Sequence, residues 1–303
     1  MDAYLNCNQC GKCCSTGPSL SFSEIFKYQD QFVLGLSCQA QTDRKENFPQ
    51  TAMGEAISVA DHQMIMDHMM SLFGRFNTLA GGYYLQIYPM DIGYSMLPHH
   101  SCSQLEASGG CALQDDKPSM CRAVPFDAVL PESQQALKIE GFKTHFTCLT
   151  TTGAEQDLIY REGEIVNSAY KAGYDAKLAD FQENMEWMVM MAQSAVARDG
   201  FMPPAEHILE VAKRGGRLEL SILFYMTVYM HQKPEAMVSR TRQVIDFCAS
   251  QIKLSNELIA KAITRKNKAE LDRTRALRSN IEVLQKLSVS AKETLATLPD
   301  AAV

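Results

Sequence analysis

Four cysteines within eight residues near the start of the chain constrain its fold most strongly. The run CNQCGKCC contains Cys7, Cys10, Cys13 and Cys14. Two residues between cysteines let the backbone turn so that both sulfurs reach one tetrahedral metal ion at about 2.3 Å. Gly11 suits such a turn because glycine readily takes a positive φ. We expect the neighbouring Cys13 and Cys14 side chains to point in different directions and to serve different roles or different ions.

A second group of cysteines follows after a long gap, at Cys102, Cys111, Cys121 and Cys148. A single turn cannot close a coordination shell, so these thiols are the expected remaining ligands. Pro118 and Pro125 lie on either side of Cys121 and restrict the backbone there. Nine of the ten cysteines lie in the first half of the chain. In a cytosolic chain, this clustering indicates metal binding or redox chemistry rather than a disulfide framework.

The composition is that of an ordinary globular protein. The 303 residues are 46% hydrophobic and 21% charged, with a formal net charge of -6, which excludes disordered, collagen-like and fibrous classes. The mild acidity argues against a nucleic-acid partner. The N-terminus lacks the basic and apolar segments of a signal peptide, and the longest strongly apolar stretch, 221–230, is about half a membrane span. We therefore expect a cytoplasmic protein without a membrane segment.

The two halves of the chain differ in their sequence patterns, which predicts an α+β protein of two domains. Residues 1–153 hold most cysteines and are expected to form an irregular metal-centred module, with short strands over 82–97. Residues 154–303 are expected to form an all-α helical bundle. The expected helices are 23–34 and 54–73, then 155–198 with a break near Gly173, 204–214, 217–231, 235–250, 253–270 and 272–297.

The last expected helix has an apolar stripe, which predicts packing against neighbouring helices or, alternatively, a dimerising coiled coil. Its members are Leu277, Ile281, Leu284, Ser288, Ala291, Leu295 and Leu298. Between residues 253 and 293 there are ten Lys and Arg against five Asp and Glu. This excess fits a solvated helix face or a docking surface for a protein or peptide partner. The oligomeric state stays open.

The cysteine motifs resemble those of the YkgJ-type cysteine-cluster family, described as a zinc- or iron-chelating domain. The resemblance covers about residues 4–150 and lies in CNQCGKCC, Cys102, Cys111, the segment KPSMCRAVPF and Cys148 in HFTCL. Lys117-Pro118 replaces the arginine-proline pair of that family. The resemblance implies a metal site of eight cysteines: Cys7, Cys10, Cys13, Cys14, Cys102, Cys111, Cys121 and Cys148. The chain is more distantly similar to flagellin lysine-N-methylases, whose motif has a different spacing.

The spacing favours an iron–sulfur cluster over zinc as the cofactor. C-x2-C-x2-C supplies the first three ligands of bacterial-type [4Fe–4S] sites, although the fourth cysteine of that run is missing here. Zinc remains the alternative, and eight thiolates could close two zinc sites, two clusters, or one cluster with four cysteines left over. Arg122 could neutralise thiolate charge at the cofactor.

Several other residues have an ordinary structural interpretation beside a functional one. His99, His100 or His145 could each replace a cysteine ligand, although an exposed or hydrogen-bonded structural role is the simpler expectation. Tyr83, Tyr84, Tyr88 and Tyr94 fit strand packing or, alternatively, a substrate-facing patch. Cys38 and Cys248 lie outside the family pattern and are expected to be buried.

These observations predict a metal-binding protein. One alternative is a metal-dependent enzyme that modifies a protein or peptide side chain by methyl transfer or oxidation. Another is a zinc-stapled adaptor without catalysis. The catalytic motifs G-x-S-x-G, H-E-x-x-H and G-x-G-x-x-G are absent from the sequence, so whether the protein is an enzyme stays open.

Overall fold

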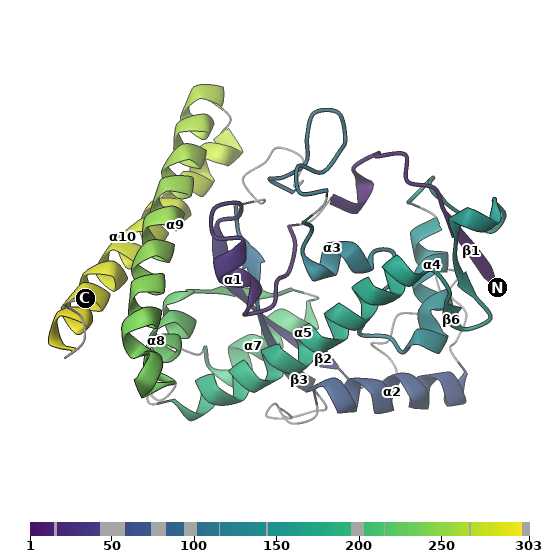
Figure 1. Ribbon diagram of the computed structural model, residues 1–303, viewed down its shortest axis with the longest axis horizontal. Helices are drawn as coiled ribbons and strands as arrows, with labels where there is room; N and C mark the ends of the chain where they lie inside the picture. Colours follow the sequence, from purple (N-terminus) through teal and green to yellow (C-terminus); the bar gives the residue numbers. More distant parts are fainter. Residues whose placement is uncertain are drawn as a thin grey trace.

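The computed structural model combines helices with two antiparallel sheets, which confirms the α+β class (Figure 1). It describes residues 1–14, 17–42, 58–73, 83–93, 102–114, 116–143, 145–194, 203–214, 216–266 and 268–298. Among these residues, no helix has the length and apolar character needed to cross a membrane.

The first sheet joins the N-terminus to the middle of the chain. Its strand order is β4 (Leu149–Thr150), β1 (Asp2–Leu5), β5 (Leu158–Arg161) and β6 (Glu164–Ile165). Leu5 pairs with Leu149 in the register of β1 and β4. The hairpin between β5 and β6 turns at Glu162 and Gly163, which both have positive φ, as a type I′ turn requires.

The second sheet lies in the core and has the order β3 (Tyr83–Asp91), β2 (Leu34–Thr42) and β7 (Leu218–Leu220). Cys38 is 1% exposed in the central strand β2, as expected of a small buried side chain. Pro89 is accommodated because β3 is an edge strand. Its carbonyl oxygen accepts a hydrogen bond from the backbone nitrogen of Leu20, which ties the chain after the cysteine run to this sheet.

Seven longer helices pack around the two sheets in the part of the chain that the structure describes. They are α2 (Val59–Phe73), α4 (Gln135–Lys143), α5 (Ser168–Gln193), α7 (Ala205–Lys213), α8 (Leu223–His231), α9 (Met237–Arg265) and α10 (Lys268–Thr297). Two short helices, α1 (Glu24–Lys27) and α3 (Ser119–Ala123), lie close to the cysteine-bearing loops. The side chain of Asn167 caps the start of α5 by accepting from the backbone nitrogens of Ala169 and Tyr170.

Several expected helix boundaries were wrong. Residues 158–165 form a hairpin because the run Leu158, Ile159 and Tyr160 is buried and favours a strand. Residues 218–220 form β7, the expected break at Gly173 does not occur in α5, and the helices expected at 235–250 and 253–270 are one helix, α9. The helix expected at 23–34 ends at Lys27.

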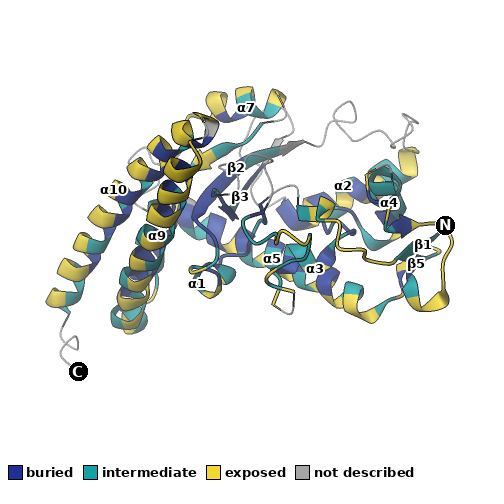
Figure 2. Ribbon diagram, turned by 90° about the horizontal axis from the view of Figure 1, so that it is seen from above, coloured by how far each residue is buried: buried dark blue, intermediate teal, exposed yellow. Residues whose placement is uncertain are grey.

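Helices α9 and α10 form an antiparallel hairpin (Figure 1). Lys266 ends α9 in the left-handed conformation with φ 54°. Figure 2 shows buried residues on the inner faces of these helices and exposed residues on their outer faces. Leu277, Ile281, Leu284 and Ala291 of the apolar stripe are buried, so the packing expected of this helix is confirmed within the chain.

Among the described residues, the larger of two hydrophobic clusters forms a core that extends from Ala3 to Ala291, and the smaller includes Ile259 of α9 and Leu277 of α10. β4 and β5, which lie on opposite sides of residue 153, both pair with β1. In the same way, β7 pairs with β2 of the first half. The domain division of 1–153 and 154–303 stays a prediction, and the sheets and the core are continuous across it.

Candidate metal centre

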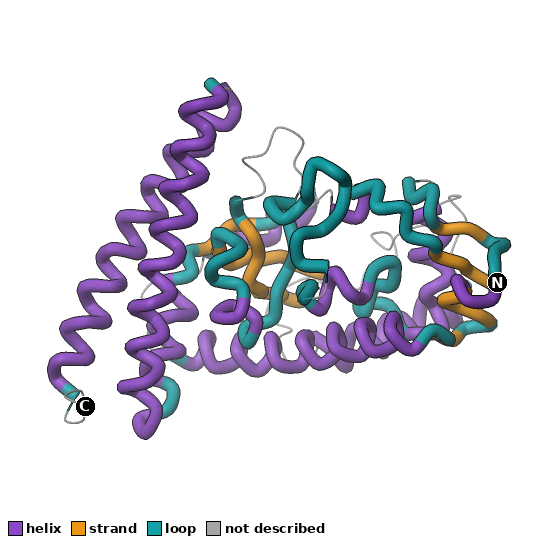
Figure 3. Tube along the Cα trace, turned by 45° about the horizontal axis from the view of Figure 1, so that its top comes forward, coloured by secondary structure: helices purple, strands orange, loops and turns teal. Residues whose placement is uncertain are grey.

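All eight cysteines of the expected ligand set line one cavity of about 340 Å³. Loops and short elements gather on this side of the molecule (Figure 3). The cysteines come from four parts of the chain: the segment after β1, the loop over 102–111, the helix α3, and the segment before β4. Cys38 and Cys248 are fully buried elsewhere, which confirms their expected structural role.

The first cysteine turn has the backbone conformation that its glycine predicts. Gly11 has φ +70°, and Cys14 donates its backbone N–H to the Gly11 carbonyl at 2.9 Å. A Cβ atom at Gly11 would lie 2.9 Å from a methyl group of Leu105. Glycine is favoured here by the positive φ, and its lack of a side chain lets the Leu105 side chain of the second cysteine loop pack against it.

The loop over residues 102–111 packs directly on this turn. The backbone nitrogen of Cys102 donates to the Cys14 carbonyl at 2.8 Å, and Leu105 pairs with Cys111 in an isolated bridge. Gly109 has φ +87°, and a Cβ atom there would overlap the carbonyl oxygen of Gln9. The backbone of each loop thus fixes the position of the other.

Cys121 and Cys148 reach the cavity from the more regular parts of the structure. Cys121 lies in α3, whose first turn begins after Pro118. Helix α5 passes so close to α3 that a Cβ atom at Gly173 would lie 2.6 Å from the Arg122 carbonyl oxygen. Cys148 directly precedes β4, and its carbonyl oxygen accepts from the Asn6 nitrogen at 3.0 Å.

Cys13 and Cys14 do not point apart, contrary to the expectation from their adjacency. Their sulfur atoms are 3.9 Å apart, and both side chains line the cavity. The reason is that both belong to one short 3₁₀ turn, Lys12–Cys14, which is wound more tightly than a strand, where neighbouring side chains alternate.

The thiols in the cavity titrate very differently from one another. A hydrogen bond from Cys14 lowers the pKa of Cys13 to about 6, with a smaller favourable contribution from Lys117 that acts against burial. The same hydrogen bond, together with burial, raises the pKa of Cys14 far above its usual value. Burial raises the pKa of Cys102 to about 11 and that of Cys121 to about 12.

Neighbouring thiolates also contribute to these shifts. The charges of Cys102, Cys111 and Cys13 raise the pKa of Cys121 further. Burial is the largest cause of the raised pKa of Cys148, and the charge of Cys10 is the second largest. Several thiolates therefore cannot coexist in this cavity without a compensating positive charge. A thiophilic metal ion or cluster would supply that charge, so the donor set fits such a group.

Among the described residues, no three His, Cys, Asp or Glu side chains are already arranged around a single ion position. Three of the cavity cysteines, Cys7, Cys10 and Cys13, are exposed. Binding of a metal by this set would thus require side chains to turn towards one another.

The other expected site residues have separate outcomes. Arg122 lines the cavity together with Lys117, whereas His145 is exposed and does not line it. His99, His100 and Tyr94 lie outside the described residues, as do the side chains of Tyr83 and Tyr84. Tyr88 donates its hydroxyl to Gln39 on the neighbouring strand at 3.2 Å.

Sequence reasoning missed Tyr170, which lies at the start of α5 and lines the cavity. Burial, followed by the charges of Cys7 and Cys148, raises the pKa of its hydroxyl. The sequence gives no signal for this role, because Tyr170 reaches the cysteines only through the packing of α5 behind α3.

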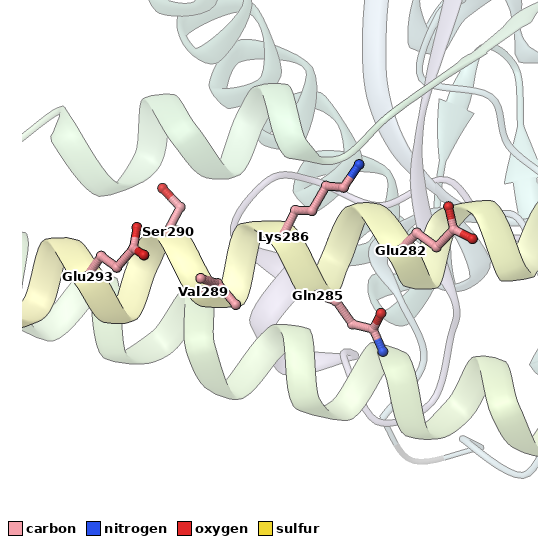
Figure 4. Close-up of a pocket in the computed structure, with 6 residues that line it drawn as sticks. All are labelled: Glu282, Gln285, Lys286, Val289, Ser290 and Glu293. Atoms are coloured by element: carbon pink, nitrogen blue, oxygen red, sulfur yellow. The ribbon is translucent and has the colours of Figure 1, made fainter.

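A separate hollow of about 450 Å³ follows one face of α10 (Figure 4). Its lining residues, Glu282, Gln285, Lys286, Val289, Ser290 and Glu293, include no cysteine. This shallow hollow on a single helix has no group suited to a soft metal.

Comparison with known proteins gives the same result at every level: no family model matches the chain, and no curated protein or solved structure is significantly similar to it.

Proposed function

We propose that this chain is a metal-binding protein that holds an iron–sulfur cluster, or alternatively zinc, through the cysteines of the cavity. The observation that carries the proposal is the convergence of eight thiols, spread over residues 7–148, on one cavity. Thiols with raised pKa values stay protonated at neutral pH and are weak nucleophiles. A bound metal would convert them to stabilised thiolates. The proposal agrees with the resemblance to the YkgJ-type cysteine-cluster family.

An iron–sulfur cluster is the favoured cofactor because of the C-x2-C-x2-C spacing of Cys7, Cys10 and Cys13. A cluster would add electron transfer or Lewis acidity to the structural role that zinc fulfils. The chain itself would provide the thiolates and, at Lys117 and Arg122, positive charge on the cavity wall. A reducing compartment such as the cytoplasm would keep these thiols available.

In this proposal, the first half of the chain is the metal-centred module and the helical second half supports it. The long helices from α5 onward would offer the surface for a protein or peptide partner, and the lysines and arginines between residues 253 and 293 would favour an acidic one.

The second candidate function is a metal-dependent enzyme that acts on a protein or peptide side chain. The observation that favours it over a closed structural staple is the exposure of Cys7, Cys10 and Cys13. A catalytic centre must be reachable by its substrate, whereas structural zinc sites are closed. Tyr170 and Gln104 add polar groups to the same cavity wall.

Purification without oxygen, followed by absorption spectroscopy and analysis of iron, zinc and acid-labile sulfide, tests the proposal. We expect a brown protein that contains iron and matching sulfide; a colourless protein with zinc would support the alternative cofactor. Cys38→Ser is the matched control, because this buried cysteine lies outside the cavity, and it should keep the metal. A folded protein that retains neither metal under these conditions, even after reconstitution with iron and sulfide or with Zn²⁺, would overturn the proposal.

A further inference from the structure

The backbone contacts divide the cavity thiols into two groups, one at each end of the cavity. At one end, the pairing of β1 with β4 continues beyond the strands themselves. Leu5 pairs with Leu149, the Asn6 nitrogen donates to the Cys148 carbonyl at 3.0 Å, and the Asn8 amide donates to the Thr147 hydroxyl at 3.4 Å. Cys7 and Cys148 are therefore held on adjacent, antiparallel backbone segments.

Cys10 belongs to the same end as Cys7. Only two residues separate them, so one turn brings both sulfurs to one ion. Cys13 follows with the same spacing and completes the C-x2-C-x2-C run. Together with Cys148, this run provides four thiols, which is the number that either a zinc ion or a [4Fe–4S] cluster requires.

At the other end of the cavity, the backbone joins Cys14 to the second cysteine loop. Cys102 donates its N–H to the Cys14 carbonyl at 2.8 Å. The two sides of the loop are joined by the Leu105–Cys111 bridge and by the hydrogen bond from the Ala112 nitrogen to the Gln104 carbonyl at 2.9 Å. The loop therefore brings Cys111 back towards Cys102.

Cys121 is tied to this same end by the residues next to it. The Ser119 nitrogen donates to Glu24 Oε1 at 2.9 Å, and the Met120 sulfur lies 3.1 Å from the Ser19 nitrogen. Ser19 and Glu24 belong to the segment that leads away from Cys14, not to the strand β1 that leads to Cys7. These contacts hold α3, and with it Cys121, beside the segment that follows Cys14.

We propose that the cavity holds two metal centres, one bound by Cys7, Cys10, Cys13 and Cys148 and the other by Cys14, Cys102, Cys111 and Cys121. This inference rests on the proposed function and adds the number of centres and the ligands of each. The sulfurs of Cys13 and Cys14 are 3.9 Å apart, so the two centres lie side by side and meet at this dipeptide.

Zn²⁺ alone is a suitable probe, because one zinc ion takes four thiolates whichever metal the protein carries in the cell. Metal-free full-length protein is titrated with Zn²⁺ and the bound ions are counted by native mass spectrometry. We expect two ions per chain for the unaltered protein. A single bound ion, or none, would overturn the two-centre inference and leave the proposed function standing, because that function is tested separately by reconstitution with iron and sulfide.

Paired substitutions test which cysteines belong together. Cys7→Ser with Cys148→Ser removes two ligands from one proposed centre and should leave one tightly bound ion. Cys7→Ser with Cys102→Ser removes one ligand from each centre and should weaken both. Cys14→Ser should behave as Cys102→Ser does, and Cys38→Ser is the control that keeps both ions. The inference fails if within-group and between-group pairs lose the same amount of zinc.

Circular dichroism separates loss of a centre from loss of the fold in these variants. Where a double variant does not fold, stepwise loading of the unaltered protein provides the second measurement. Two separate centres should give a resolved one-ion species before the two-ion species. Alkylation of that one-ion species should protect one group of four cysteines while the other group reacts, and protection spread evenly over all eight would overturn the grouping.

Discussion

The neighbouring cysteines Cys13 and Cys14 show how the shape of a single turn determines the chemistry of a thiol. Because the 3₁₀ turn brings the two sulfurs together, one thiol donates a hydrogen bond to the other and their pKa values move in opposite directions. An exposed thiol with a lowered pKa is a reactive nucleophile. The sequence indicated the importance of this pair, but the expectation that its two side chains point apart was wrong.

We predict that in metal-free protein at pH 7, iodoacetamide reacts with Cys13 faster than with Cys102 or Cys121. The pKa of Cys13 is about 6, whereas those of Cys102 and Cys121 are about 11 and about 12, and only the thiolate is alkylated. Peptide mass spectrometry over a time course measures the three rates. Cys14→Ala removes the hydrogen-bond donor and should slow the reaction of Cys13, and equal rates at the three cysteines would contradict the prediction.

The apparent affinity for Zn²⁺ should rise as the pH is raised from 6 to 8. The raised pKa values of Cys102 and Cys121 mean that both thiols are protonated over this whole range. Each must release a proton when a metal binds, and each released proton makes the affinity about tenfold stronger per pH unit. Competition with a chromogenic chelator at several pH values measures this slope, and a pH-independent affinity would show that these thiols are not ligands.

At the scale of the elements, the contact between α3 and α5 positions Cys121. Gly173→Ala should destabilise the protein by about 1–3 kcal/mol, because the new methyl group would press on the backbone of α3. Gly141→Ala in α4 is the matched control: nothing lies within 4 Å of its new Cβ, so it should stabilise the protein by about 0.5–1 kcal/mol. Urea unfolding compares the two, and a neutral Gly173→Ala would show that α3 can move away freely.

The packing of the second cysteine loop on the first turn gives a similar prediction. Gly109→Ala introduces both an unfavourable φ and an overlap with Gln9, whereas Gly163→Ala introduces the unfavourable φ with its nearest neighbour at 3.8 Å. Gly163→Ala is the control: it should lower the free energy of unfolding by about 1–2 kcal/mol and keep the metal. Gly109→Ala should lose metal as well, as measured by elemental analysis. Equal metal content in the two variants would contradict the role of this loop contact.

Helices could be predicted from the sequence where the apolar pattern repeats over several turns. The apolar stripe of α10 gave its buried residues Leu277, Leu284 and Ala291 correctly. Short strands were missed, since Leu158–Arg161 and Leu218–Leu220 are four and three residues long, too short to show a period of two among helical neighbours. The low helix propensity of glycine predicts a break at Gly173, whereas in the structure this glycine allows the close approach of α5 to α3.

At the scale of the whole molecule, the cysteines that line the cavity could be predicted from the sequence. The sheet and helix packing that brings them together could not be predicted. Spacing and motif resemblance selected eight cysteines, and all eight line one cavity. The pairing of β1 with β4 and β5 depends on contacts more than 140 residues apart in the chain, which no local pattern encodes. The place of Tyr170 in the cavity depends on the same long-range packing.

Removal of the metal should loosen the N-terminal sheet more than the distant helices. Bound metal at about 1,000 times its Kd would stabilise the fold by about 4 kcal/mol, and two of its proposed ligands, Cys7 and Cys148, flank β1 and β4. Hydrogen exchange before and after chelation should therefore speed up in Asp2–Leu5 and change little in α9. Equal protection of β1 in both states would contradict this expectation.

The sheet that joins the first residues to Leu149 also sets an order of events during synthesis. At roughly 5–20 residues per second, the partner segment of Cys7 leaves the ribosome on the order of ten seconds after Cys7 itself. Throughout that interval the thiols of the first turn lack β4, and for most of it they also lack the loop over 102–111. The nascent chain thus passes through a period in which the thiols of the first turn are open to oxidants and to competing metal ions, before the segments that enclose them have been made.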